Sequence, residues 1–486
     1  MTESIFSFFL SKEKNTTEYP FEKSCAIGGY NLLTDAKTPL DYYKKDNREL
    51  IIFGYAVDVF NGQSKNLAET ILTNTNNFTE VIEQEKQLGG KYVIFYADEN
   101  GVCCMGDATC SVPIFYSVGL PVICCSNPNF IVKAFGIKKD DKLLKIRESG
   151  PLGQAMPFDI TAYKEIKQLI PNHYYNLTEQ KKVRFINSFK KQKKISVEEA
   201  VKITLPMVEK MTEYYLSKFD VYCPLTGGRD SRVIYALLKK LCNNVNSYTI
   251  WLDHLKSDKQ DWDIPVEVVK QGNTNHEQLE LIEVSEEEKR SMDDLLGENN
   301  YPFEAFALSL TIKKNYPNVA VIEGDILGQI SQCHVHRDVP AFLASPRYFR
   351  CKVHNYSKDT VKLMKAWMKE IQQSDEQVNI LDLFCVENRL GIWASYTHLL
   401  RNLVGQVNLN NFNSRNLIYV WTAVSSKDRS KALINLELIK ATYPQTLNIP
   451  FGQDGGFVKL AKKNGLTYYM ATFLKYYLEK RKFYKN

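Results

Sequence analysis

Residues 221–241 read VYCPLTGGRDSRVIYALLKKL, which is an apolar run, a glycine turn and an amphipathic stretch in succession. The apolar run is typical of a buried strand, and the segment from Ser231 onward is typical of a helix. The turn between them then lies at the carboxyl edge of a parallel sheet, where open α/β sheets bind their ligands. The sequence therefore predicts a ligand site at the mouth of this helix.

The same alternation continues beyond this stretch. Strand patterns at 246–252 and 277–284 flank a helical pattern at 263–272. This βαβαβ order predicts a parallel sheet with right-handed crossovers. Beyond residue 330 most segments have helical periodicity, among them 357–373 and 428–444.

The first 180 residues have a different character. β-branched and aromatic runs at 49–60 and 89–117 predict strands. The segment ADENG at 97–101 has the composition of a hairpin turn, so that two of these strands should pair directly.

A basic, polar stretch at 189–199 interrupts the strand pattern and is typical of a linker that enters a helix. Ser196 and Glu199, three residues apart, have the spacing of a capping box. We therefore expect an α+β domain over residues 1–185 and an α/β domain over residues 190–486.

The glycine turn carries side chains suited to phosphate. Gly227 and Gly228 let the backbone approach a ligand closely, and the amides after them point at an anion at the helix N-terminus. Thr226 and Ser231 add hydroxyl donors. Asp230 would repel a bare phosphate, but it fits a magnesium ion that bridges to the phosphates. The lysine of a Walker A loop is absent, which excludes a P-loop kinase or GTPase signature.

Bulk composition narrows the class of protein. A net charge of +6 over 486 residues does not indicate nucleic-acid binding, and no stretch approaches the ~20 apolar residues of a membrane span. Eleven cysteines without a C-x-x-C pair favour reduced thiols. We expect a cytoplasmic protein without nucleic-acid or membrane partners, acting alone or as a homodimer.

The segment LTGGRDSR resembles the S-G-G-x-D-S pyrophosphate loop of the ATP pyrophosphatases, with Thr226 in place of serine. Other segments resemble the asparagine synthetase-like family in the order in which that family has them, and they lie at 163–177, 246–252, 270–281, 318–330 and 428–444. The chain is most similar in character to lactam synthetases and lasso-peptide cyclases. This resemblance implies a C-terminal PP-loop sheet with a helical extension, behind an N-terminal Ntn-type sandwich.

The resemblance also implies a set of cofactors and site residues. Family members use ATP and Mg²⁺, and Asp230 and Asp325 align with the magnesium ligands, Asp230 being counted as catalytic too. Lys431 aligns with a lysine that stabilises charge on the α-phosphate, and Glu387 is a candidate base for the acceptor amine. The residues that would contact the nucleotide are Leu225, Thr226, Gly227, Gly228, Arg229, Ser231, Ile250 and Gly324.

The chain also departs from the family at several positions. Ile326 and Ile322 stand where ammonia-using synthetases have glutamates, and Asn435 stands where the family has arginine. The N-terminal cysteine of glutamine-dependent relatives is missing, and Thr2 is not expected to replace it. We therefore expect a degenerate class II glutamine amidotransferase-like domain without glutaminase activity.

Two further groups are weaker candidates. His276 aligns with a family histidine, but we expect it to be structural. Cys333, His334 and His336 could contact a metal, yet no fourth ligand is evident in the sequence.

The expected function is that of an AMP- and pyrophosphate-forming carbon–nitrogen ligase. It would adenylate a carboxylate-bearing small molecule or peptide and form an amide or lactam with an amine whose source stays open. Two alternatives stay open as well: a catalytically inactive family member that binds nucleotide or substrate, and a glutamine- or ammonia-dependent asparagine synthetase-type amidotransferase. A tRNA-modifying pyrophosphatase is disfavoured because the thiol pair and basic patch are lacking.

Overall fold

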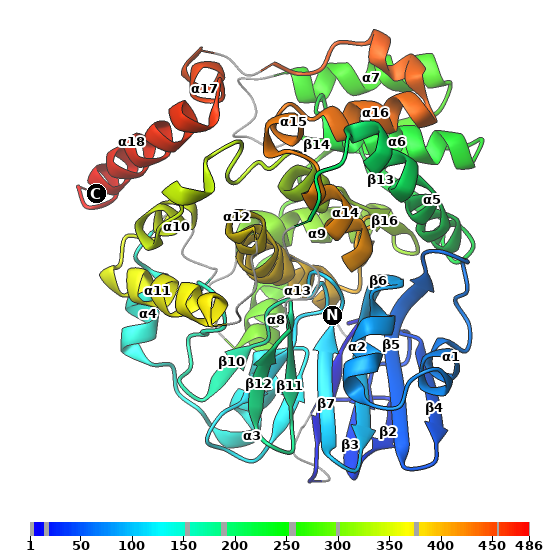
Figure 1. Cartoon of the computed structure of the whole chain (residues 1–486), viewed down its shortest axis with the longest axis vertical. Coiled ribbons are helices and arrows are strands. Elements are labelled where there is room, and N and C mark those ends of the chain that lie inside the picture. The colour runs from blue at the N-terminus through cyan, green and yellow to red at the C-terminus, as the bar shows by residue number, and fades with distance from the viewer. Residues whose placement is uncertain are drawn as a thin grey trace.

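Three sheets organise the protein in the computed structural model, which describes residues 4–13, 19–150, 156–185, 192–251, 259–297, 302–373, 379–453 and 456–485. Two antiparallel six-stranded sheets lie in the lower part of Figure 1, and a parallel five-stranded sheet lies above them. This arrangement confirms the predicted α/β class, with a sandwich of sheets first and a parallel sheet second.

The N-terminal region packs its two antiparallel sheets face to face. The first sheet has the order β10-β8-β9-β1-β3-β2, with bounds Ile166–Gln168, Phe115–Ser117, Ile123–Cys125, Phe8–Ser11, Tyr30–Thr34 and Lys23–Ile27. The second has the order β12-β11-β7-β6-β5-β4, with bounds Lys181–Arg184, His173–Asn176, Gly101–Gly106, Leu88–Asp98, Arg48–Asp58 and Leu40–Lys45. Strands β6 and β7 pair through the hairpin predicted at 97–101.

Aromatic side chains fill the space between these sheets. Phe8 of β1 lies edge-on to Phe53 of β5 and Phe95 of β6, with ring centroids 6.0 and 5.2 Å apart. All three are fully buried. Burial of each such ring contributes about 1.5–3 kcal/mol, so this layer holds the two sheets together. Four short helices border the sandwich: α1 (Leu67–Thr73), α2 (Phe78–Glu85), α3 (Pro128–Phe135) and α4 (Asp141–Arg147).

The C-terminal sheet has the order β15-β14-β13-β16-β17, and all its strands are parallel. Their bounds are Asn275–Glu280, Asn246–Trp251, Val221–Pro224, Ala320–Ile322 and Val407–Leu409. Helix α5 (Val197–Leu216) precedes β13, and the helices α6 (Arg229–Leu241), α7 (Gln260–Gly272), α8 (Glu286–Leu296) and α9 (Phe303–Asn315) lie between β13 and β16 in sequence. Ser196 caps α5 by accepting from the Glu199 amide at 3.1 Å, as its position predicted.

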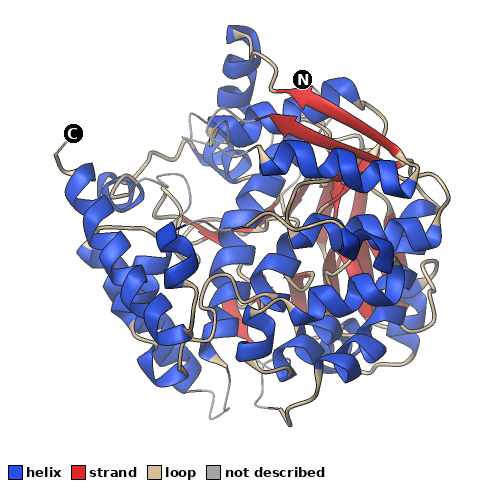
Figure 2. Ribbon diagram, turned by 90° about the horizontal axis from the view of Figure 1, so that it is seen from above, coloured by secondary structure: helices blue, strands red, loops and turns tan. Residues whose placement is uncertain are grey.

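Helices dominate the rest of the chain. They are η2 (Leu327–Ser331), η3 (Ala341–Leu343), α10 (Pro346–Lys352), α11 (Lys358–Gln372), α12 (Ile380–Phe384), η4 (Cys385–Ala394), α13 (Ser395–Leu403), α14 (Arg415–Ala423), α15 (Ser426–Ser430), α16 (Leu433–Thr442), η5 (Pro444–Asn448), α17 (Gly456–Ala461) and α18 (Gly465–Phe483). Seen from above, helices lie in front of many of the strands, whereas two long strands near the N label stay uncovered (Figure 2).

The predicted helix at 357–373 is confirmed as α11, but the one at 428–444 is wrong as a single helix. It is split into α15 and α16, because Ala432 adopts a left-handed backbone with φ of 60°. Non-glycine residues rarely adopt this conformation, so an alanine gives no warning of the break.

Buried polar contacts join the N-terminal region to the helical extension. Arg415 of α14 donates to the Glu85 carboxylate at 2.6 Å, to the Asn172 side chain, and to the carbonyls of Gly106 and Asp107. Arg415 is 2% exposed and Glu85 is fully buried. The predicted domain boundary at 185–190 lies largely outside the described residues, as does Thr2, and the division into domains stays a prediction.

No helix within the ranges given above is long and apolar enough to cross a membrane. All eleven cysteines carry free thiols, and most are buried. Burial raises the pKa of several of them, Cys103 to about 12 for example, which keeps these thiols protonated and unreactive.

We predict that Arg415→Met lowers the free energy of unfolding by about 3–5 kcal/mol, because it leaves the Glu85 carboxylate buried without its cation. Urea titration at neutral pH measures this loss. The double variant Glu85→Gln/Arg415→Met should recover much of it, since the buried charge is then gone. A single variant as stable as the wild type would contradict the assigned role of this contact.

Candidate active site

The site lies where two neighbouring strands of the parallel sheet end. β13 pairs with β16, so the loop after Pro224 and the loop after Ile322 leave the same edge of the sheet. A Cβ on Gly324 would lie 3.5 Å from the Cβ of Asp230. Sequence positions almost a hundred residues apart are thereby brought into contact, as predicted for Asp230 and Gly324.

Hydrogen bonds within the glycine turn hold it in shape. The Leu225 amide donates to the Tyr248 carbonyl at 2.8 Å and continues the pairing with β14. The Thr226 amide donates to Ser231 Oγ at 3.1 Å, and the Gly228 amide donates to Thr226 Oγ1 at 3.1 Å. Thr226 therefore supplies the hydroxyl that closes the turn.

Helix α6 begins directly after this turn, with Gly228 at its N-cap and no side chain capping it. The first-turn amides of an α-helix have no partner within the helix, and its dipole attracts anions. The sequence expectation of a helix from Ser231 onward is thus correct in kind, although the helix begins two residues earlier, at Arg229.

One contact shows that the turn accepts an oxyanion. The Gly227 amide donates to Oδ1 of Asp261, from the first turn of α7, at 2.8 Å. A Cβ on Gly227 would lie 3.0 Å from the Gln260 carbonyl and 3.1 Å from the same carboxylate oxygen, so a side chain has no room here. The carboxylate stands in for an anionic oxygen, and the residues of the turn fit the phosphates of a nucleotide.

Asp230 is held by neutral donors. Its Oδ1 accepts from the side-chain amides of Gln332 and Asn435, the latter at 2.8 Å. Loss of hydration raises the pKa of Asp230 to about 7, although these hydrogen bonds and the charge of Arg229 act in the opposite direction. The charge on Asp325 adds to the rise, so the two carboxylates lie within electrostatic range of each other.

Asp325 has a different environment, because cations face it. It lies 3.5 Å from Nε2 of His398, and Asn410 donates to its other oxygen. Burial opposes its ionisation, but the hydrogen bond and charge of His398, with the charge of Arg401, hold the pKa of Asp325 below its usual value. The ionised carboxylate of Asp325 thus lies near the carboxylate of Asp230, which has no cationic hydrogen-bond partner. This pair suits Mg²⁺, which binds one or two carboxylates together with phosphate oxygens.

The other predicted nucleotide contacts lie around this turn. Ile250 is the second-last residue of β14, and the neighbouring Thr249 donates its hydroxyl to the Leu225 carbonyl at 2.5 Å. The guanidinium of Arg229 lies 5.1 Å from the centre of the Phe451 ring. Arg232, by contrast, is fully buried and donates to the carbonyls of Thr446, Ile449 and Pro450, which ties the chain after α16 to α6.

Lys431 is exposed on the short connection between α15 and α16, rather than at the start of one continuous helix. Asn435, one turn further on, contacts Asp230 instead. Sequence reasoning noted Asn435 only as a lost arginine and missed Gln332 altogether. The catalytic role of Lys431 stays a prediction.

Glu387 lies in a buried polar network. It is fully buried and accepts from Arg184 at 2.5 Å, from Asn172 at 3.0 Å and from the Trp367 indole at 2.7 Å. These partners engage both carboxylate oxygens, and two of the three belong to the N-terminal region. The role of Glu387 as a base for an acceptor amine stays a prediction.

His276 lies between two strand hydroxyls, 2.9 Å from Ser247 Oγ and 3.2 Å from Thr249 Oγ1. Burial lowers its pKa to about 4, so the ring is neutral and forms part of the sheet edge. This agrees with a structural role.

Cys333, His336 and Asp382 form the one group of three metal-ligating side chains found within the ranges that the structure describes. Arg429, however, grips the Asp382 carboxylate with both of its terminal nitrogens, at 2.8 and 2.7 Å. Nε2 of His336 lies within hydrogen-bond distance of Oδ1 of the same carboxylate, at 2.9 Å. The guanidinium already neutralises this group, which is therefore a buried ion pair and a poor metal site.

No protein-family model and no curated protein matches this chain. Several solved structures show distant similarity, and three of them are the following. The U34-tRNA thiolase NcsA of Methanococcus maripaludis is 13% identical with a TM-score of 0.20, over 40% of this chain and 75% of that one. The NH3-dependent NAD synthetase of Campylobacter jejuni is 14% identical with a TM-score of 0.20, over 37% and 85%. The glutamine phosphoribosylpyrophosphate amidotransferase of Bacillus subtilis is 9% identical with a TM-score of 0.24, over 68% and 72%.

Asp230 predicts a pH dependence of stability. Its pKa rises from 3.8 to about 7 on folding, so between these values the folded protein holds a proton that the unfolded chain has released. Stability therefore falls as the pH rises through this window and levels off above it. Asp230→Asn removes the ionisable group and should be more stable than the wild type at about pH 8, with the gain vanishing near about pH 4. Urea titrations of both proteins with EDTA present measure this, and a gain independent of pH would contradict it.

Proposed function

We propose that this chain is an ATP-dependent carbon–nitrogen ligase that adenylates a carboxylate, releases pyrophosphate and forms an amide or lactam with release of AMP. The observation that supports it best is the meeting of an anion-binding glycine turn with two carboxylates, Asp230 and Asp325, at one edge of a parallel sheet. Carboxylates beside an anion-binding turn repel a bound phosphate, unless a cation lies between the carboxylates and the phosphate.

Each residue has a definite part in binding the nucleotide. Gly227 and the first-turn amides of α6 hold the β- and γ-phosphates, and the hydroxyls of Thr226 and Ser231 complete the cradle. For this the Asp261 carboxylate has to leave the Gly227 amide, which the phosphate then occupies. Asp230 and Asp325 would hold Mg²⁺, which when bound neutralises phosphate charge and orients the triphosphate.

The chemistry is mainly positioning. An oxygen of the substrate carboxylate attacks the α-phosphorus, the bond to the bridging oxygen breaks, and pyrophosphate leaves. The nitrogen of the amine then attacks the acyl carbon, the bond to the AMP oxygen breaks, and the amine loses a proton. Holding the reactants in line and neutralising their charge supplies most of such a rate enhancement. Lys431 extends from its exposed position to the α-phosphate and stabilises the negative charge there.

The proposal does not specify where the attacking amine comes from. An amine already on the substrate and an amine supplied by a second molecule both fit the proposal. The following experiment separates this proposal from a nucleotide-binding protein without activity. An asparagine synthetase-type enzyme would share the adenylation step and would differ only in the source of the amine.

The test is ATP–pyrophosphate exchange by the purified protein with magnesium and pools of carboxylic acids. We expect exchange that requires a carboxylate and falls by about 10²-fold or more in Asp230→Ala and in Asp325→Asn, because each loses a charge that holds the metal. The variant Asp359→Ala, at a partly exposed position of α11 away from the site, is the control for the loss of an acidic side chain as such. Nucleotide binding without exchange would favour the inactive alternative, and absence of both would refute the ligase.

Gly328→Ala tests the geometry without touching a charge. Its Cβ would lie 2.9 Å from Asp230 Oδ2 and 3.0 Å from His334 Nδ1, so both side chains have to move. We expect the exchange rate to fall by about 10-fold or more while the unfolding midpoint changes little, since misplacement of a reacting group is costly. Full exchange in this variant would show that the position of Asp230 does not matter.

A further inference from the structure

A cavity of about 530 Å³ lies beside the proposed site, between η2, α10, η4 and α18. This volume suits a small organic molecule. Its walls carry His334 from the chain after η2, Lys352 from α10, Arg389 from η4, and Tyr468 and Lys475 from α18.

The cavity is connected with the reacting centre through His334. Nδ1 of His334 and Oδ2 of Asp230 lie against the same side of Gly328, at 3.0 and 2.9 Å from the place of a Cβ. His334 Nε2 lies 3.1 Å from Gln332 Oε1, and the same Gln332 donates to Asp230. A molecule in the cavity can therefore present one end to the proposed nucleotide site.

The charge on the cavity wall is unbalanced. Glu479 is the one acidic residue among those that line it, and it is already engaged by His354 at 2.9 Å and Lys475 at 3.6 Å. Lys352 donates to the Thr472 hydroxyl and lies 4.1 Å from the centre of the Tyr468 ring. Arg389 lies 4.0 Å from the centre of the Trp393 ring. No ion pair within the described ranges gives either cation a carboxylate.

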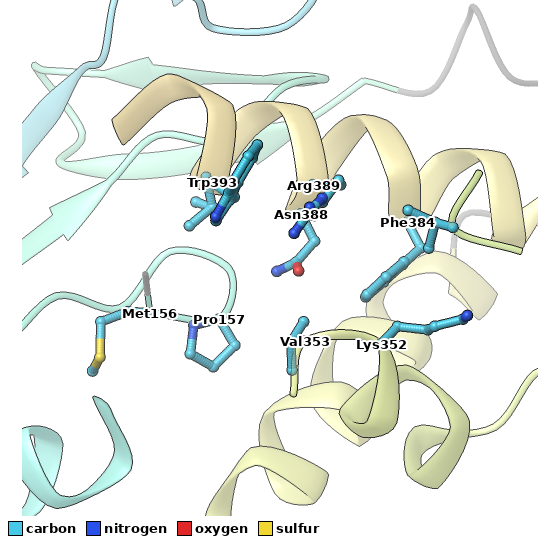
Figure 3. Close-up of a pocket in the computed structure, with 10 residues that line it drawn as sticks. Met156, Pro157, Lys352, Val353, Phe384, Asn388, Arg389 and Trp393 are labelled. Carbon is cyan, nitrogen blue, oxygen red and sulfur yellow. The ribbon is translucent and has the colours of Figure 1, made fainter. Parts of the chain in front are cut away.

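A smaller recess opens from the same wall, because Val335, Lys352 and Arg389 line both spaces. It has a volume of about 30 Å³, enough for one small group, and Phe384 and Trp393 form part of its wall. Figure 3 shows Asn388 pointing from η4 into the space between Pro157 and Val353. Asn388 is 5% exposed, and its Nδ2 is buried with no hydrogen-bond partner in the part of the chain that is described.

A buried donor without an acceptor destabilises the free protein, and so does a desolvated cation without an anion. Lys352, Asn388 and Arg389 all line the recess; the amide of Asn388 is buried without an acceptor, and the two half-buried cations have no carboxylate partner in the described ranges. An anionic group at this wall would give the amide an acceptor and the cations a counter-ion. Burial, together with the charges of Lys475 and Arg337, lowers the pKa of Lys352 to about 7, which an anion beside it would reverse.

We propose that this cavity binds the acid substrate of the ligase, and that Lys352, Arg389 and Asn388 hold a second anionic group of it, a carboxylate or a phosphate. The inference rests on the proposed function for the identity of the reacting end. The substrate is then an acid with at least two anionic groups, one activated near Asp230 and one anchored at the recess.

The test compares three acids of similar size by calorimetric titration: butyrate with one carboxylate, succinate with two, and 3-phosphoglycerate with a carboxylate and a phosphate. We expect at least one of the two acids with a second anionic group to bind about tenfold or more tightly than butyrate, because that group gains charged hydrogen bonds at the recess. Which dianion binds more tightly identifies the anchored group.

Lys352→Met and Arg389→Met should each abolish this preference, and Lys362→Met, at an exposed lysine of α11, should keep it. Methionine fills a similar volume without charge, and Lys352→Gln repeats the test if the methionine variant does not fold. No preference in the wild type, or a preference retained in the Lys352→Met/Arg389→Met double variant, would overturn the proposal.

Titration of a non-hydrolysable ATP analogue into the same proteins separates the two proposals. Wild type and the Lys352 and Arg389 variants should all bind the analogue with magnesium. If none binds it while the dianion preference depends on Lys352, the ligase fails and the anion site stands. If the analogue binds and the preference is absent, the anion site fails and the ligase stands.

Discussion

The parallel pairing of β13 with β16 is the constraint on which the rest of the site depends. Val221 pairs with Ala320 and Tyr222 with Val321, so the two strands end together. Parallel neighbours need long crossovers, and here two further strands and four helices, α6 to α9, lie between them in sequence. A shift of this register by one residue would exchange the two faces of the shifted strand and would separate Asp230 from Asp325.

On either side of His334 the protein keeps charges of opposite sign apart. Asp230 has neutral partners and a raised pKa, whereas Lys352 has no acidic partner and a lowered one. An ion pair between Asp230 and Lys352 would bring both pKa values back toward their usual range, yet the two side chains face different spaces. Perturbed groups of this kind mark ligand sites when they line a cleft, because the missing partner comes with the ligand. The separation of Asp230 from Lys352 therefore fits a ligand with two anionic ends. One end would meet a metal cation held by Asp230, and the other would meet the cationic side chains of the cavity.

Local sequence predicted what depends on local structure. The strand–turn–helix at 221–241 follows from glycines between two periodic segments, and its position at the carboxyl edge follows from parallel order. Long-range contacts are another matter, since nothing near Asn435 or Gln332 in the sequence indicates that they reach Asp230. The segment η4 is a π-helix, in which spacing read as α-helical misplaces the side chains, so nothing in the sequence indicated that Asn388 and Arg389 line one recess.

Buried ion pairs also join the N-terminal region to the helical extension. Glu85 of the N-terminal region is neutralised by Arg415 of the helical extension, and Glu387 of the extension by Arg184 of β12. Lys91 of β6, 1% exposed, donates to Asn402 at 2.8 Å across the same boundary. Each region therefore buries charges whose partners only the other supplies, and neither could keep them buried alone without a large cost. Because Asn402 and Arg401 are adjacent on α13, and Arg401 pairs with Glu323 two residues before Asp325, the sandwich also holds the acidic loop in place. The N-terminal region is thus a structural part of the site, whether or not it has chemistry of its own.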